Sequence, residues 1–161
     1  MKIAITGESG FIGRNLPKSI EKFGHEFVSL NEYNNFVSRR PRTDEPCVYN
    51  NSEQIWIRAF YDLDIDVIIH NAAVVGTDVV ALNTVEAINT NVLGTKIITE
   101  AANTSGLLNV YFGTTVIYDT YAYQESDITE TSTVFPRTDY AIQKHAGEMI
   151  VRNNAKEWLV A

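Results

Sequence analysis

The chain has 161 residues, of which 45% are hydrophobic and 20% are charged, so its size and composition fit one globular domain with a sizeable core. Its net charge of -7 and its pI near 4.9 argue against general binding to nucleic acids or anionic membranes. The single cysteine, Cys47, excludes an internal disulfide bond and a cysteine-based metal cluster, and we expect no metal site. No apolar run is long enough to span a membrane, and no signal-peptide pattern precedes the first strand. We therefore expect a cytoplasmic protein.

The N-terminal thirty residues predict a strand, a helix and a second strand. Residues 2–6 are a buried apolar run, a helical pattern covers about residues 10–23, and residues 26–30 form the next strand. Glycines at positions 7, 10 and 13 stand in the turn between the first strand and the helix. Such a turn lets a ligand approach main-chain N–H groups, and a helix N-terminus attracts a pyrophosphate. The turn therefore predicts a nucleotide-binding loop, with a plain tight turn as the alternative.

The end of the second strand bears on the choice of nucleotide. In dinucleotide-binding sheets an acidic residue at this tip selects NAD, whereas this chain has Asn31 there. Arg39 and Arg40 follow in a basic cluster and can pair with a 2′-phosphate, although such a cluster can also be a solvated loop. These residues slightly favour NADP over NAD. A loop over residues 31–46 and a short strand at residues 47–49 would then bring Asn51 near the adenine.

The rest of the chain continues the alternation of helices and strands. We expect a helix ending near Tyr61, a long helix beginning between residues 82 and 85 and ending at 105, and a last helix over about residues 139–154. Buried strands are expected at residues 66–70 and 108–112, and residues 158–161 begin a sixth strand. The small residues Asn71, Ala72 and Ala73 follow one strand at the edge where open sheets bind ligands.

Two polar residues on the predicted core surfaces need an explanation. His70 ends a buried strand and is more often structural than a catalytic base at such a position. Asn91 lies on the inward stripe of the long helix and needs partners when it is buried. We expect Asn91 to hold a neighbouring main chain or to shape the ligand pocket.

Three residues in the C-terminal half of the chain are candidates for one catalytic site. Tyr140 and Lys144 are four residues apart, so a helix places them on the same face. An ammonium beside a phenol lowers the phenol pKa and makes it a better general acid or base. Thr114, at the end of a strand, can bind the same substrate oxygen. Together the three residues predict a site that stabilises an alkoxide during hydride transfer to or from a nicotinamide.

Five stretches of the chain resemble the extended short-chain dehydrogenase/reductase family, also called the NAD-dependent epimerase/dehydratase family. They follow the family's order and spacing along the whole chain: residues 6–13, 70–73, 91–95, 113–118 and 140–144. By resemblance, Thr114 takes the family's serine or threonine role, Tyr140 is the acid/base, and Lys144 lowers the tyrosine pKa and holds the ribose.

The resemblance also extends the candidate cofactor site. It implies that Phe11 and Ile12 offer main-chain N–H groups to the pyrophosphate, that residues 71–75 line the cofactor, and that Asn91 approaches it. Together with the residues derived above, the candidate cofactor-binding residues are Gly7, Gly10, Phe11, Ile12, Gly13, Asn31, Arg39, Arg40, Asn51, Asn71, Ala72, Ala73, Val75, Asn91, Tyr140 and Lys144.

The resemblance implies an α/β fold of the Rossmann type, a doubly wound parallel sheet with helices on both faces, in an NAD- or NADP-binding domain over residues 1–161. It also implies an oxidoreductase or epimerase that acts on a nucleotide-activated sugar. The alternatives are a non-catalytic NAD(P)-binding module and a reductase of a non-sugar carbonyl. Thr115 and Val116 replace the Asp-Glu pair of the family's dehydratases, so dehydratase activity is not expected. Family members are about twice as long, so we expect a fragment or single domain without the substrate domain. The resemblance separately implies a homodimer that packs through the last two long helices.

Overall fold

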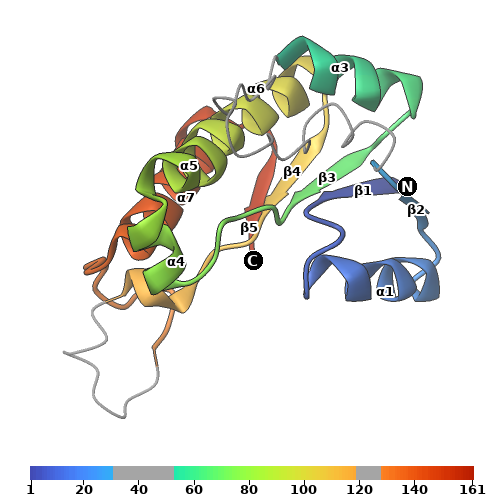
Figure 1. Ribbon diagram of the computed structural model, residues 1–161. Helices are drawn as coiled ribbons and strands as arrows, with labels where there is room; N and C mark the ends of the chain where they lie inside the picture. The colour runs from blue at the N-terminus through green and yellow to red at the C-terminus, as the bar shows by residue number, and fades with distance from the viewer. Residues whose placement is uncertain (31–52, 119–127) are drawn as a thin grey trace.

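The computed structural model describes residues 1–30, 53–118 and 128–161. Its centre is a parallel sheet with the strand order β2-β1-β3-β4-β5 (Figure 1). The described strands are β1 (Lys2–Thr6), β2 (Glu26–Val28), β3 (Val67–His70), β4 (Leu108–Tyr111) and β5 (Trp158–Val160). The strand predicted at residues 47–49 lies outside the described residues.

Helices cover both faces of the sheet, as the sequence predicts. The α-helices are α1 (Leu16–Lys22), α3 (Glu53–Asp62), α4 (Thr77–Leu82), α5 (Thr84–Ile88), α6 (Thr95–Ser105) and α7 (Asp139–Asn154). Short segments of other helix types are η1 (Gly13–Asn15), η2 (Asn89–Gly94, a π-helix) and η3 (Thr115–Ile117). Figure 1 shows α1 on one face and α3, α6 and α7 on the other.

The core follows the two-residue period of the strands. Ile3 and Ile5 of β1 pack with Ile20 of α1 on one face. Ala4, between them, belongs to the cluster on the opposite face, with Trp56 of α3 among its buried members. Because both faces of β1 are covered, the strand is apolar at successive positions and not at alternate ones.

The strand order places a crevice at the carboxyl end of β1. The chain passes from β1 through α1 to β2 on one side, whereas β3 pairs with β1 on the other side. Connections that diverge from one strand leave a gap at the carboxyl edge of the sheet, where open α/β sheets bind ligands. The glycine-rich turn and the segment after β3 both border this point.

One predicted helix differs from the observed one, and another contains a π-helical turn. Residues 10–12 form a turn, and α1 begins only at Leu16, where Pro17 occupies its first turn without loss of a helical hydrogen bond. The long helix expected from between residues 82 and 85 to residue 105 is confirmed, because α5, η2 and α6 follow one another without a gap from Thr84 to Ser105, and the short helix α4 precedes it. The π-helical turn of η2 changes the direction of the residues it contains, and π-turns of this kind often occur at functional sites.

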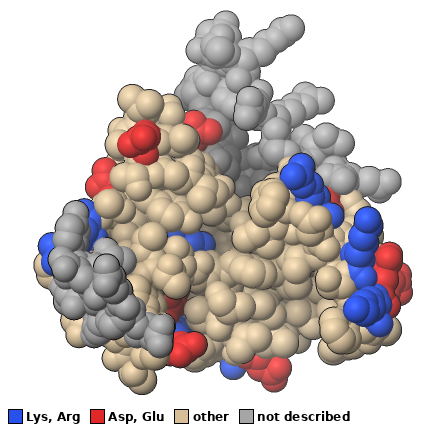
Figure 2. All heavy atoms as spheres, turned by 90° about the horizontal axis from the view of Figure 1, so that it is seen from below, with Lys and Arg blue, Asp and Glu red and all other residues tan. Residues whose placement is uncertain are grey.

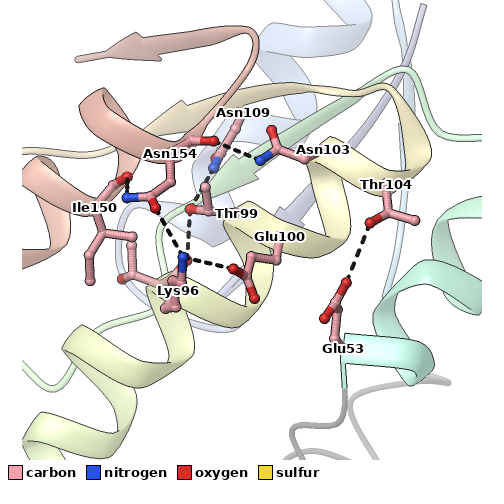
Figure 3. A network of polar contacts seen from close by, with 10 residues as sticks. Glu53, Lys96, Thr99, Glu100, Asn103, Thr104, Asn109, Ile150 and Asn154 are labelled. Atoms are coloured by element: carbon pink, nitrogen blue, oxygen red, sulfur yellow. Dashed lines mark hydrogen bonds and ion pairs between the residues drawn. The ribbon is translucent and has the colours of Figure 1, made fainter.

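A polar network fixes α6 against its neighbours at the end of the molecule away from the crevice (Figure 3). Lys96 of α6 donates to the side chain of Asn154 at 3.0 Å, and Asn103 donates to the Asn154 carbonyl at 2.7 Å. Thr104 reaches Glu53 of α3 at 3.4 Å. These contacts tie α6 to both the start of α3 and the end of α7.

Candidate active site

The glycine-rich turn depends on its glycines for its close contacts. Gly7 has a φ of +72°, and a Cβ there would lie 2.9 Å from the Cα of Ala72 in the segment after β3. A Cβ at Gly13 would overlap the Gly7 carbonyl oxygen. A side chain at either position would therefore displace the backbone.

The turn exposes main-chain donors at the crevice. Gly10 donates to the Gly7 carbonyl at 3.0 Å, which closes the turn. Among the described residues, the N–H groups of Phe11 and Ile12 have no backbone acceptor, and both residues are exposed. Donors arranged before the first helix in this way fit the pyrophosphate of a nicotinamide dinucleotide.

His70, at the end of β3, is held in a buried chain of hydrogen bonds. The Nδ1 atom lies 2.8 Å from the Thr6 hydroxyl, and Nε2 lies 3.0 Å from the Thr95 hydroxyl. Thr95 gives its own proton to the Asn91 carbonyl, so it accepts from Nε2, and Nδ1 accepts from Thr6. Burial, with a smaller effect of the Lys144 charge, lowers the pKa of His70 to about 3.

His70 is therefore a neutral structural residue, as its position at the end of a buried strand predicts. Thr6, having donated to the imidazole, accepts from the Ala72 N–H at 3.1 Å. Thr6 and His70 thus link β1 and the segment after β3 to Thr95 at the start of α6.

Asn91 of η2 holds the segment after β3 by its main chain. Its side-chain oxygen accepts from the Val74 N–H at 2.8 Å, and its amide donates to the Val74 carbonyl at 3.0 Å. The same amide donates to Gln143 of α7 at 2.9 Å. The expectation that Asn91 holds a neighbouring main chain is confirmed, and Gln143 is a partner that the sequence analysis missed.

The remaining predicted residues after β3 line the same edge. Asn71 donates to the Gly7 carbonyl at 3.4 Å, a long hydrogen bond that joins this segment to the glycine-rich turn. Ala72 and Ala73 are partly exposed, and Val75 is exposed. Asn31, Arg39, Arg40 and Asn51 lie outside the described residues.

Thr114 and Tyr140 meet where β4 ends and α7 begins, and Lys144 follows Tyr140 one helical turn along α7. Thr114 and Tyr140 form a side-chain hydrogen bond. The Lys144 ammonium donates to the Phe112 carbonyl at 2.7 Å and lies 4.2 Å from the centroid of the Tyr111 ring. The helix N-cap Thr138, which accepts from the Ala141 N–H, fixes the start of α7 so that Tyr140 lies in its first turn.

The electrostatics of this group differ from the sequence prediction in one respect. Burial lowers the pKa of Lys144 to about 8, and the Glu148 carboxylate opposes this shift. Burial raises the pKa of Tyr140, with the Thr114 hydrogen bond opposing the rise. Burial therefore outweighs any lowering of the Tyr140 pKa in this structure, the Lys144 ammonium is directed at the Phe112 carbonyl, and the effect of Lys144 on the tyrosine stays a prediction.

A glycine inside α7 was also missed by the sequence analysis. A Cβ at Gly147 would overlap the Tyr111 hydroxyl and would lie 3.1 Å from the Asn91 carbonyl oxygen. Tyr111 donates to the Lys144 carbonyl at 3.1 Å. The signal for this close packing was a glycine in the interior of a helical pattern, where it costs stability unless a neighbour requires it.

Seen from below, the molecule is hollowed between the side where α4 lies and the side where α1 lies, and most of its charged side chains lie toward the rim (Figure 2).

Among the described residues, no group of three or more His, Cys, Asp and Glu side chains is arranged to hold a metal ion. None of the helices in the described ranges is both long and apolar enough to cross a membrane.

Comparison with known proteins identifies a family model that matches almost the whole chain. The model, described as the NAD dependent epimerase/dehydratase family, matches residues 3–160. No curated protein sequence matches the chain.

Solved structures similar to this chain include several nucleotide-sugar enzymes. A dTDP-4-dehydrorhamnose reductase from Bacillus anthracis in complex with NADP has a TM-score of 0.80 at 18% identity, over 99% of this chain and 51% of that one. The Bordetella bronchiseptica enzyme WbmG, in complex with NAD and UDP, has a TM-score of 0.71 at 27% identity, over 98% and 51%. UDP-glucose 4-epimerase from Thermus thermophilus, in complex with NAD, has a TM-score of 0.75 at 20% identity, over 99% and 54%. The chain spans about half the length of these structures.

Proposed function

Because the chain belongs to the NAD-dependent epimerase/dehydratase family, we propose that it is the dinucleotide-binding part of a cytoplasmic oxidoreductase or epimerase acting on a nucleotide-activated sugar. The observation that supports this most directly is the position of Thr114, Tyr140 and Lys144. Tyr140 hydrogen-bonds Thr114 across the junction of β4 and α7, and Lys144 lies one helical turn further along. A hydrogen-bonded threonine and tyrosine with a lysine one helical turn away would suit a carbonyl or alkoxide oxygen during hydride transfer.

The three residues have distinct parts in the proposed reaction. A nicotinamide, when bound, supplies or accepts the hydride. Tyr140, whose pKa is raised by burial, is a protonated phenol that donates its proton to the developing alkoxide during reduction and takes it back during oxidation. Thr114 holds the same oxygen by its hydroxyl. Lys144, protonated below its pKa of about 8, supplies a positive charge beside the reacting oxygen and the cofactor ribose.

The glycine-rich turn provides the place for the cofactor in this proposal. The exposed donors at Phe11 and Ile12 would bind the pyrophosphate, and the segment that Asn91 holds at Val74 would lie along the nicotinamide half. The cofactor is NAD or NADP. The slight preference for NADP depends on Asn31, Arg39 and Arg40, so Arg40→Ala should weaken NADPH binding more than NADH binding if this cluster holds a 2′-phosphate.

A nucleotide sugar is the proposed substrate because similar solved structures include enzymes that bind UDP or act on a nucleotide sugar. WbmG is bound to NAD and UDP, and the enzyme from Thermus thermophilus is a UDP-glucose 4-epimerase. A non-catalytic module is the second candidate, but such a module has no need of the paired Tyr140 and Lys144. A reductase of non-sugar carbonyls would use the same three residues and differs only in its substrate.

The test begins with cofactor binding. The protein is titrated with NADH and NADPH while nicotinamide fluorescence and the melting temperature are followed, and at least one cofactor should bind and stabilise the fold. It is then incubated with the oxidised or reduced cofactor and UDP- or dTDP-sugars, with the nicotinamide absorbance as readout. Binding of neither cofactor would refute the proposal. Cofactor binding with conversion of simple carbonyls, and with no response to any nucleotide sugar, would favour the non-sugar reductase.

A further inference from the structure

An acidic residue lies inside the glycine-rich turn. Glu8 stands between Gly7 and Gly10, and although the turn is at the surface, the residue is only 8% exposed. Its Oε1 atom accepts a hydrogen bond from the Ser29 hydroxyl at 3.1 Å. Ser29 directly follows β2, so the hydrogen bond places the Glu8 carboxylate at the carboxyl end of that strand.

This position is the adenosine end of a dinucleotide site. In such sheets an acidic side chain at the tip of the second strand accepts from the ribose 2′-hydroxyl and repels the 2′-phosphate of NADP. Here β2 pairs directly with β1, and the residue expected at the tip is the uncharged Asn31. The carboxylate beside Ser29, the residue that follows β2, comes instead from the turn after the neighbouring strand.

We infer that Glu8 is a specificity-determining residue that makes the site favour NAD(H) over NADP(H). This inference rests on the proposed function, because it assumes that a nicotinamide dinucleotide binds along the glycine-rich turn. A buried carboxylate held by Ser29 cannot swing away into solvent, and its repulsion of a 2′-phosphate is screened less than it would be at the surface. The carboxylate can accept from a free 2′-hydroxyl, so the same group improves one cofactor and penalises the other.

The inference opposes the preference drawn from Arg39 and Arg40. Arg39 and Arg40 would attract a 2′-phosphate if they approached it. The Glu8 carboxylate, which lies at the end of β2 beside Ser29, would repel it. The two effects predict opposite preferences in the wild-type protein, so one measurement distinguishes them.

The experiment compares the wild type with two single-charge variants. Glu8→Gln keeps an oxygen that can accept from Ser29 and removes the charge. Glu26→Gln is the matched control. Glu26 is exposed and begins β2, at the end opposite to Ser29. Each protein is titrated with NADH and with NADPH, by nicotinamide fluorescence, at low and high salt.

We expect the wild type to bind NADH more tightly than NADPH, with the difference narrowing as salt is added. Glu8→Gln should shift the ratio of the two dissociation constants toward NADPH by about tenfold, and Glu26→Gln should leave it unchanged. A wild type that prefers NADPH would overturn the inference. So would a shift in Glu8→Gln no larger than that in the control.

A competition measurement on the wild type covers the case in which Glu8→Gln does not fold. Bound NADH is displaced with AMP and with adenosine 2′,5′-bisphosphate, and the inference requires AMP to be the stronger competitor. Stronger competition by the bisphosphate refutes it. If the wild type binds neither nicotinamide, the proposed function itself fails and the inference fails with it, whereas binding without the expected preference removes only the role of Glu8.

Discussion

Tyr140 is the residue on which the proposed chemistry depends most directly. Tyr140→Phe removes the phenolic proton and the hydrogen bond to Thr114 but keeps the ring, so turnover should fall by roughly 100-fold or more. The affinity for the nicotinamide cofactor should remain nearly unchanged. The measurement is the turnover number from nicotinamide absorbance together with the dissociation constant from fluorescence. Tyr61→Phe, at an 83% exposed tyrosine of α3, is the matched control, and turnover retained by Tyr140→Phe would remove this residue as the acid/base.

The buried imidazole of His70 makes the stability of the fold sensitive to acid. Its pKa is about 3 in the folded chain, against an ordinary histidine value of 6.5, so between these values the unfolded chain binds a proton that the folded chain does not. Its contribution to stability is therefore fully present above pH 6.5 and is lost as the pH falls toward 3.

Between pH 6.5 and pH 5, we expect this loss to amount to about 2 kcal/mol of unfolding free energy. Urea unfolding at both pH values should show the loss in the wild type and a smaller one in His70→Gln, whose amide can still bridge the two threonine hydroxyls. His25→Gln changes a histidine outside this buried chain and should behave as the wild type does. Equal losses in His70→Gln and the wild type would show that His70 is protonated in the folded chain.

At the scale of elements, η2 joins α7 to the segment after β3 through one side chain. Asn91→Ala leaves the N–H and carbonyl of Val74 and the oxygen of Gln143 without this partner, and unmet buried polar groups of this kind cost about 1–3 kcal/mol each. We expect the variant to lose about 3 kcal/mol or more of unfolding free energy and to bind NADH more weakly, because the segment proposed to line the cofactor is no longer held.

The readouts for Asn91→Ala are urea unfolding and the NADH dissociation constant, with Asn83→Ala as the control. Asn83 is an exposed asparagine between α4 and α5, and its amide makes only a long contact of 3.4 Å with the Val79 carbonyl. If Asn91→Ala is less stable but binds NADH as tightly as the wild type, Asn91 stabilises the fold and has no role in cofactor binding.

The same elements show what the sequence could and could not predict. The apolar runs of β1 and β3 and the period of α7 were readable because buried parallel strands and a capped helix have simple local patterns. The π-helical turn of η2 between α5 and α6 was not, since Asn91 in this turn makes tertiary contacts with Val74 and Gln143 that no local pattern marks. In the candidate site, the spacing of glycines 7, 10 and 13 predicted the turn. The raised pKa of Tyr140 was not predictable, because it results from burial, which the spacing of residues does not show.

At the scale of the whole molecule, a group of neighbouring helices carries several large, exposed apolar residues. They lie on α4, α5, η2 and α7, elements that pack against one another, and several are large and exposed: Leu82, Val85, Leu93, Ile142 and Met149. An apolar surface of this kind on a globular protein marks a contact with another molecule. We propose that it is the face through which two copies of this chain form a homodimer.

This proposal gives a direct prediction for the oligomeric state. Leu82 and Val85 are 83% and 74% exposed, so Leu82→Lys and Val85→Lys introduce charge without removing core packing, and burying those charges in a symmetric contact would be costly. Light scattering on the wild type should give twice the mass of the chain, and the double variant should be monomeric with an unchanged melting curve at high dilution. Tyr61→Lys, at an equally exposed aromatic residue of α3 away from this surface, should remain a dimer. A monomeric wild type at micromolar concentration would refute the homodimer, and dissociation by Tyr61→Lys would place the contact on α3 instead.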